Sequence, residues 1–145
     1  MPLCGSIATG HDGQMALAVC LLFDSRTERR LVNLWTSLEA DGIASLPSHT
    51  HGRHVPHLSY AVLRRYDVEA VGAALRWLPG AGPLPLHFDA VGHFRRGRVA
   101  LVPAVSGELV ARQERVVAVV EATGADLHVH YRPGSWVPHC SIATR

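Results

Sequence analysis

The sequence predicts an α+β fold built from two similar halves. Its 145 residues are 48% hydrophobic and 18% charged, which is typical of one globular domain with an ordinary core. Apolar periodicities predict elements in the order β-α-β, α, β-β-α-(β)-β, which suits two packed α+β halves. A seven-residue phrase also occurs twice, 82 residues apart: Val55-Pro56-His57-Leu58-Ser59-Tyr60-Ala61 returns as Val137-Pro138-His139-Cys140-Ser141-Ile142-Ala143.

The first half is expected to open with a strand and a helix. The continuous apolar run at 16–23 predicts a buried central strand. Ser25 and Glu28 then have the spacing of a capping box, and Gly42 is a suitable end for the helix that follows. After a loop rich in Pro and Gly, the first copy of the phrase predicts a strand from about His57 to Leu63.

Asp67 is expected to cap a second helix, which the proline-rich stretch 79–85 ends. The second half is then predicted to contain a strand that starts near Leu86, a hairpin turn at 94–99, a strand at 99–105, a helix at 108–122, a short strand at 127–131 and the second copy of the phrase.

Residues 1–14 have no clear period and are interpreted as a loose N-terminal arm, which leaves 15–145 as a single bilobal domain.

Composition excludes several classes of protein. A net charge of +2 does not indicate a broad nucleic-acid surface, and the apolar run at 15–23 is too short to span a bilayer. The cysteines form no CxxC pair, and reduced thiols favour a cytoplasmic location; Cys20 and Cys140 are expected to be small buried side chains.

The repeated phrase carries the clearest chemical signal. On a strand, residues i and i+2 face the same side, so each histidine and its serine point together: His57 with Ser59, and His139 with Ser141. Imidazoles titrate near neutral pH, so one ring can accept a proton while another donates one, and hydroxyls can hold phosphate oxygens. The alternative is a duplicated strand whose His and Ser only complete a hydrogen-bond network.

These residues resemble the two-histidine (2H) phosphoesterase superfamily, which includes 2′-5′ RNA ligase-like proteins and cyclic nucleotide phosphodiesterases. Its hallmark is a pair of His-x-Thr/Ser motifs, each followed by an apolar residue; His57-Leu58-Ser59-Tyr60 and His139-Cys140-Ser141-Ile142 both fit, with Ser in place of the commoner Thr. The resemblance covers about residues 15–145. It implies two pseudo-symmetric lobes whose antiparallel-rich sheets flank a central cleft, with the helices outside.

The resemblance implies a metal-independent phosphoesterase without a cofactor. Its expected substrate is a small nucleotide or RNA end that carries a phosphate, above all a 2′,3′-cyclic nucleotide or a 2′-5′ phosphodiester. His57 and His139 would act as general base and acid in an order left open, with Ser59 and Ser141 on the phosphoryl oxygens, and hydrolysis is favoured over ligation. The alternative is a non-catalytic RNA- or nucleotide-binding module on the same architecture.

Members of this superfamily usually continue beyond the second motif, whereas this sequence stops at Arg145. A further edge element would then come from more chain or from a partner, such as the second copy in a homodimer. No membrane partner is expected.

Other histidines raise the alternative of a metal site. His49, His51 and His54 crowd one loop with His57, and His128 and His130 are expected to share a strand face. Histidine pairs of this kind can bind zinc, yet no Asp, Glu or Cys accompanies them at ligand spacing. We therefore expect no metal site.

Four aromatic residues near the motifs are candidates for stacking a base, although most aromatics beside strands belong to the core; they are Tyr60, Phe94, Tyr131 and Trp136. Three arginines, Arg95, Arg96 and Arg98, gather at the predicted hairpin turn. A solvated turn is the simpler interpretation of this cluster, and contact with nucleotide phosphates is the alternative.

Overall fold

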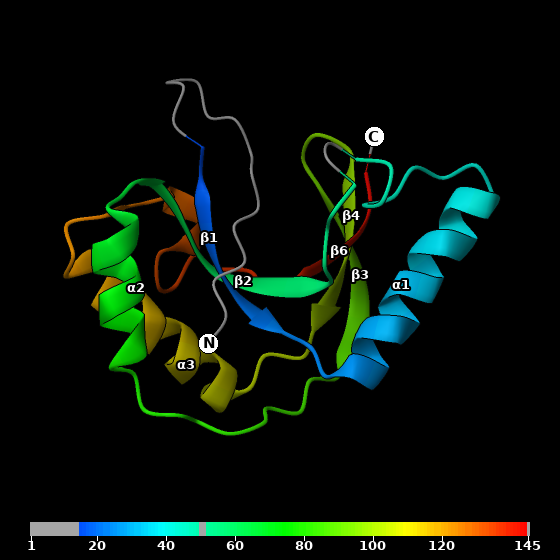
Figure 1. The fold of residues 1–145 in the computed structure, drawn as a ribbon. Coiled ribbons are helices and arrows are strands. Elements are labelled where there is room, and N and C mark those ends of the chain that lie inside the picture. Colours follow the sequence, from blue (N-terminus) through cyan, green and yellow to red (C-terminus); the bar gives the residue numbers. More distant parts are fainter. Residues whose placement is uncertain (1–14, 50–51, 145) are drawn as a thin grey trace. The chain divides into compact units, whose positions relative to one another are not determined.

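The computed structural model describes residues 15–49 and 52–144 (Figure 1). The fold is α+β, as predicted, and within the described residues it has three α-helices and two three-stranded sheets. The expected arm at 1–14 and His51, one of the loop histidines considered for the metal-site alternative, lie outside the described residues. No helix in the described part of the chain has both the length and the apolar character that a membrane span requires.

The chain divides into two compact units, each assembled from three separate stretches of sequence. Unit 1 draws on the chain up to Leu21, on Ser59–Leu86 and on Val105–Pro138. Unit 2 draws on Leu22–Leu58, on His87–Ala104 and on the chain from His139 onward. Each unit therefore combines segments from both predicted halves of the sequence, and each unit contains part of both copies of the repeated phrase.

Unit 1 has a sheet in the order β1-β2-β5, formed by Leu17–Leu22, His57–Arg65 and Asp126–Leu127. Its helices, α2 at Val68–Arg76 and α3 at Gly107–Glu121, pack side by side (Figure 1). The buried amide of Gln113 on α3 donates to the backbone carbonyls of Tyr60, 3.2 Å away, and Tyr131, 2.8 Å away. This side chain ties the helix both to β2 and to the loop that leads into the second phrase.

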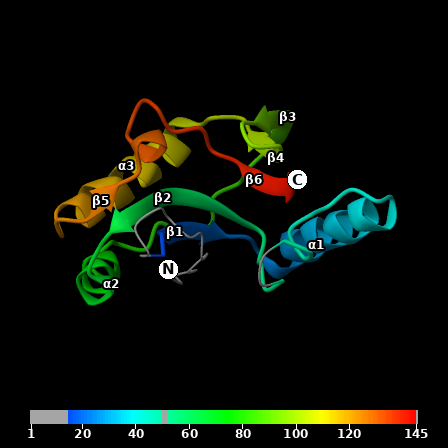
Figure 2. The same ribbon diagram turned by 90° about the horizontal axis from the view of Figure 1, so that it is seen from above.

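Unit 2 has a sheet in the order β3-β4-β6, formed by Phe88–Phe94, Arg98–Pro103 and Cys140–Ala143 (Figure 2). Both pairs in this sheet are antiparallel. Helix α1, Ser25–Ala40, packs on β6 and contributes the buried side chains of Leu31 and Trp35. The last strand of the described chain is therefore held between β4 and α1, which both come from earlier in the sequence.

Local signals in the sequence set most of the element boundaries. The Asp67 carboxylate accepts hydrogen bonds from the backbone N–H groups of Glu69 and Ala70, so the predicted cap of α2 is confirmed. The turn between β3 and β4 has positive φ angles at Arg96 (67°) and Gly97 (73°). Two successive positive φ angles match the right-handed twist of a tight hairpin, which confirms the predicted turn.

Three predictions about local structure were wrong. The cap of α1 is Asp24 rather than Ser25, because its carboxylate accepts from two backbone N–H groups of the first turn. The run at 16–23 forms β1, but β2 occupies the centre of its sheet. The strand predicted at 127–131 is only two residues long, and a 3-10 turn at Val129–Tyr131 follows it.

Candidate active site

The two His-x-Ser motifs have the same exposure pattern in the structure. In each, the histidine and the serine are half-buried while the residue between them and the residue after them are buried. The buried pairs are Leu58 with Tyr60 and Cys140 with Ile142. Both strands therefore turn their apolar residues into a core and leave one imidazole and one hydroxyl on the other face, as the period of two requires.

The backbone that leads into each motif is also repeated. Gly52 and Gly134 each lie five residues before a motif histidine, and their φ angles are +67° and +81°. L-residues with a side chain rarely adopt this conformation, so glycine suits both positions. The prolines that precede the histidines, Pro56 and Pro138, are both buried. The duplication thus extends from sequence to backbone conformation.

The two motifs touch each other within unit 2. The backbone N–H of His57 donates a hydrogen bond to the sulfur of Cys140, the middle residue of the second motif. Burial raises the pKa of the Cys140 thiol to about 12, and this hydrogen bond opposes the shift. Cys20 and Cys140 are both small buried side chains, as predicted. A neutral thiol thus lies at the point where the two phrases meet.

The imidazole of His57 has a defined proton. Its Nδ1 lies 2.6 Å from the backbone carbonyl oxygen of Val55. A carbonyl oxygen only accepts, so Nδ1 carries the hydrogen and Nε2 is the nitrogen at which the ring gains or loses a proton. This short contact within one phrase also limits rotation of the ring, because turning the imidazole away would break the hydrogen bond.

The imidazole of His139 lies against an aromatic ring. The ring of Phe94, the last residue of β3, has its centroid 4.6 Å from that of His139 at an interplanar angle of 34°. Immediately after His139, strand β6 pairs with β4 through Leu101–Cys140 and Ala100–Ser141. Aromatic packing and sheet pairing therefore fix the second motif from two directions.

A tryptophan holds the backbone of each motif serine. The indole N–H of Trp35 donates to the carbonyl oxygen of Ser141 at 3.2 Å, and the indole N–H of Trp136 donates to the carbonyl oxygen of Ser59 at 3.0 Å. The sequence patterns did not indicate this role for either residue. Their positions differ relative to the motifs, since Trp35 lies on α1 and Trp136 shortly before the second phrase, so no repeat in the sequence marks them.

Ser59 differs from the other three motif residues in its surroundings. Its hydroxyl lies 3.6 Å from the sulfur of Cys20 on β1, and either group can donate. Ser59 is the first residue of β2 that belongs to unit 1, whereas His57, His139 and Ser141 belong to unit 2. The predicted catalytic set therefore contains three residues of unit 2 and one residue, Ser59, of unit 1. His57 and Ser59 both lie on β2.

The four candidate stacking residues have different environments. Tyr60 is fully buried, and its ring centroid lies 6.0 Å from that of Trp136, which is half-buried. Phe94 and Tyr131 are also half-buried, and the carbonyl of Tyr131 is bound by Gln113. Tyr60 thus has the environment of a core residue, while Phe94 lies directly beside a motif histidine. Base stacking by any of the four stays a prediction.

The remaining histidines form pairs. The rings of His49 and His54 stack with centroids 6.0 Å apart, and those of His128 and His130 lie 5.0 Å apart around the 3-10 turn rather than on a strand face. Burial, followed by the neighbouring His130, lowers the pKa of His128. Among residues 15–49 and 52–144 no group of three or more His, Cys, Asp or Glu side chains is placed to hold a metal ion.

Comparison with known proteins gives one family. A family model described as the 2′-5′ RNA ligase superfamily matches residues 26–145. This match covers both His-x-Ser motifs and most of the chain. Neither the curated proteins nor the solved structures yielded a match.

The tryptophan contacts predict a measurable loss of stability. Trp136→Phe removes one hydrogen bond and is expected to lower the free energy of unfolding by about 1 kcal/mol. Trp35→Phe also shrinks a buried side chain, so its loss is expected to be larger, about 2 kcal/mol. Urea denaturation followed by far-UV circular dichroism measures both. Trp77→Phe is the matched control because Trp77 is 88% exposed; equal stability of all three variants would contradict the assigned contacts.

Burial of Cys140 predicts an unreactive thiol. The thiolate is the reactive species, so a pKa of about 12 leaves almost none of it at pH 8. In the native protein, peptide mass spectrometry after iodoacetamide treatment at pH 8 is expected to find Cys140 unmodified, whereas the urea-unfolded protein is alkylated there. Alkylation of Cys140 at equal rates in both states would show that the two motifs do not enclose this sulfur.

Proposed function

Because the chain belongs to the 2′-5′ RNA ligase superfamily, which is the 2H phosphoesterase superfamily, we propose that it hydrolyses a phosphodiester with an adjacent 2′-oxygen. A 2′,3′-cyclic nucleotide or a 2′-5′-linked or cyclic RNA end is the proposed substrate. His57 and His139 carry the acid–base chemistry, and Ser59 and Ser141 bind the phosphoryl oxygens. The proposed reaction takes place at these two motifs, and it requires neither a metal nor a cofactor.

The observation that carries this proposal is the repetition of one geometry. Two half-buried imidazoles, each with a half-buried hydroxyl two residues later, stand at two strands whose phrases meet at His57 and Cys140. A structural duplication alone would need only the buried positions of each phrase. The polar positions are kept as well, and they match the requirements of proton transfer to and from a phosphoryl group.

In the proposed step one P–O bond forms and another breaks. Water attacks phosphorus, and one histidine takes a proton from it as the new P–O bond forms. The bond from phosphorus to the leaving ribose oxygen breaks, and the other histidine gives that oxygen a proton, so the product is a phosphate monoester beside a free hydroxyl. For His57 the exchanged proton is at Nε2, since Nδ1–H is bound to the Val55 carbonyl. Either histidine can be the base, and ligation would reverse their roles.

The serines supply charge stabilisation rather than proton transfer. As negative charge grows on the non-bridging oxygens, each hydroxyl can donate one hydrogen bond to them. The indole of a tryptophan fixes the backbone of each serine, so the donor is already placed when the charge develops. The half-buried positions of Phe94 and Trp136 support a role for these two aromatics in binding the base of the nucleotide.

This proposal predicts the loss of turnover when either histidine is removed. His57→Ala and His139→Ala are each expected to lower kcat at least about 100-fold, because a positioned acid or base contributes that much. The assay is a screen of 2′,3′-cyclic nucleotides, 2′-5′-linked oligonucleotides and ADP-ribose cyclic phosphate, with and without a chelator, which is expected to have no effect. His93→Ala is the matched control, since this exposed histidine lies on β3 outside the motifs.

Wild-type rates in either motif variant on the substrate that is turned over would contradict the proposed mechanism. Binding of these nucleotides by the wild-type protein and by both variants, without turnover of any compound, would instead identify a non-catalytic binding module. Loss of turnover in the presence of a chelator would replace the proposed mechanism with one that depends on a metal.

A further inference from the structure

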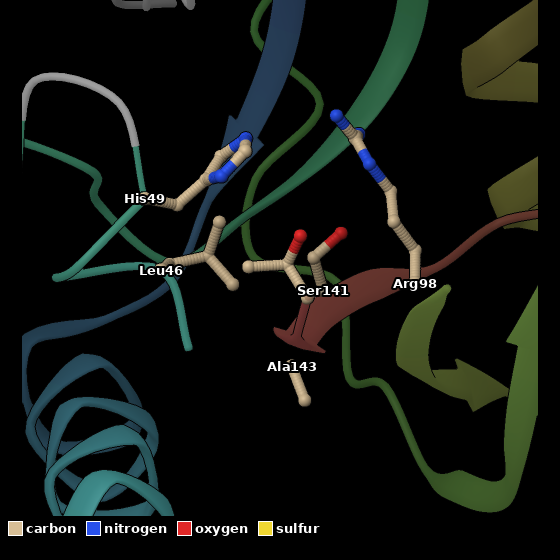
Figure 3. A pocket seen from close by; sticks show the side chains of 6 residues that line it. Leu46, His49, Arg98, Ser141 and Ala143 are labelled. Carbon is tan, nitrogen blue, oxygen red and sulfur yellow. The ribbon is translucent and has the colours of Figure 1, made fainter. Parts of the chain in front are cut away.

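A small hollow in unit 2 opens beside the second motif. Its lining comes from three places: the loop after α1, the first residue of β4, and strand β6 with the residue that follows it (Figure 3). The hollow has a volume of about 10 Å³, which is room for about one water-sized atom. The lining residues are Leu46, His49, Arg98, Ser141, Ala143 and Thr144.

The polar groups of this hollow can donate hydrogen bonds to an anion. In Figure 3 the imidazole of His49 and the guanidinium of Arg98 stand on either side, with Ser141 between them. No carboxylate is among the lining side chains. Within the described part of the chain, Arg98 forms no ion pair, although other arginines do. The site thus offers an uncompensated cation beside a motif hydroxyl.

The fold fixes the groups that make up this site. Arg98 pairs with Phe94 across the β3–β4 hairpin, and Phe94 is the residue whose ring packs on His139. Ala100, two residues further along β4, is the partner of Ser141, and the register shifts between Val99 and Ala100, so the shared lining of the hollow, rather than regular alternation along β4, relates Arg98 to Ser141. The stacked ring of His54 supports the imidazole of His49. One hairpin therefore supplies both a neighbour for the motif histidine and a cation for the motif serine.

We propose that Arg98, with His49 and the hydroxyl of Ser141, binds a phosphoryl oxygen of the substrate. A single oxygen matches the size of the hollow, and the rest of the phosphate would remain outside it. The planar guanidinium presents its donors in a fork, so it can donate to the oxygen in the hollow and to a second oxygen of the same phosphate outside it. This inference rests on the proposed function for its substrate. Of the three arginines at the β3–β4 turn, Arg95, Arg96 and Arg98, it gives a role in binding to Arg98.

The bound oxygen can belong to either of two phosphates. It can be a non-bridging oxygen of the reacting phosphodiester, because Ser141 lines the hollow, or an oxygen of a second phosphate on the same nucleotide. Turnover separates these sources. If the reacting group is bound, Arg98→Ala lowers kcat equally on 2′,3′-cyclic nucleotides with a 5′-hydroxyl and with a 5′-phosphate. If a second phosphate is bound, the substitution raises KM for the 5′-phosphorylated compound alone.

The site itself is tested by the affinity for inorganic phosphate, measured by isothermal titration calorimetry without any turnover. Arg98→Ala is expected to weaken phosphate binding about tenfold or more, because it removes a charged hydrogen-bond donor. Arg98→Lys should recover part of the affinity, since the charge returns without the fork. Arg95→Ala is the matched control: it removes the same charge from the same turn, and Arg95 does not line the hollow.

Equal weakening by Arg98→Ala and Arg95→Ala, or no weakening by Arg98→Ala, would overturn the proposed site. The absence of turnover of every phosphodiester by the wild-type protein would contradict the proposed function instead, and the phosphate affinities of the four proteins would still decide whether the hollow binds an anion. Far-UV circular dichroism of each variant confirms that a change in affinity does not come from unfolding.

Discussion

The hydrogen bond from the backbone N–H of His57 to the sulfur of Cys140 joins the two copies of the repeated phrase. Residues 83 positions apart in the sequence meet here, and the rest of the candidate site is arranged around this contact. Leu58 and Cys140 are buried beside it, so the intervening polar residues of each phrase stay on the other faces of their strands. A small, buried and neutral side chain suits this position, because a larger one would separate the phrases and a charged one would be costly to bury.

Around this contact, each motif is held by different residues in an equivalent way. In the first motif, the imidazole is hydrogen-bonded to the Val55 carbonyl and the serine carbonyl accepts from the indole of Trp136. In the second motif, the imidazole packs on the ring of Phe94 and the serine carbonyl accepts from the indole of Trp35. Convergent bracing of this kind is what preorganised acid–base and charge-stabilising groups require. Two of the three tryptophans in the sequence therefore donate hydrogen bonds to the backbone carbonyls of the two motif serines.

The parts of the fold that depend on local signals followed from the sequence. The cap at Asp67, the hairpin at Arg96 and Gly97, and the alternation within both phrases need only neighbouring residues to specify them. The predictions were wrong where a neighbouring residue competes for the same role, or where a contact distant in the sequence determines the local structure. Asp24 replaced Ser25 as a cap because a carboxylate one position earlier reaches the same N–H groups, and the strand predicted at 127–131 was cut to two residues when the chain turned.

The candidate site shows the same division. The motif residues are visible because they repeat in the sequence, and the superfamily match covers both copies. The residues that brace them, Trp35 and Trp136, and the Arg98 hollow depend on which strands pair, so no spacing in the sequence marks them. Arg98 is indistinguishable from Arg95 and Arg96 along the chain, and only its place at the start of β4 sets it beside Ser141.

The central claim is that the two phrases form one phosphate site. Nitrogen NMR of histidine-labelled protein, titrated with a nucleoside 2′-monophosphate, tests it most directly, with His57→Gln and His139→Gln used to assign the two signals. We predict that the ring nitrogens of His57 and His139 shift together, with one stoichiometric ligand and one shared Kd. A response from only one of the two histidines, or two separate Kd values, would contradict the claim.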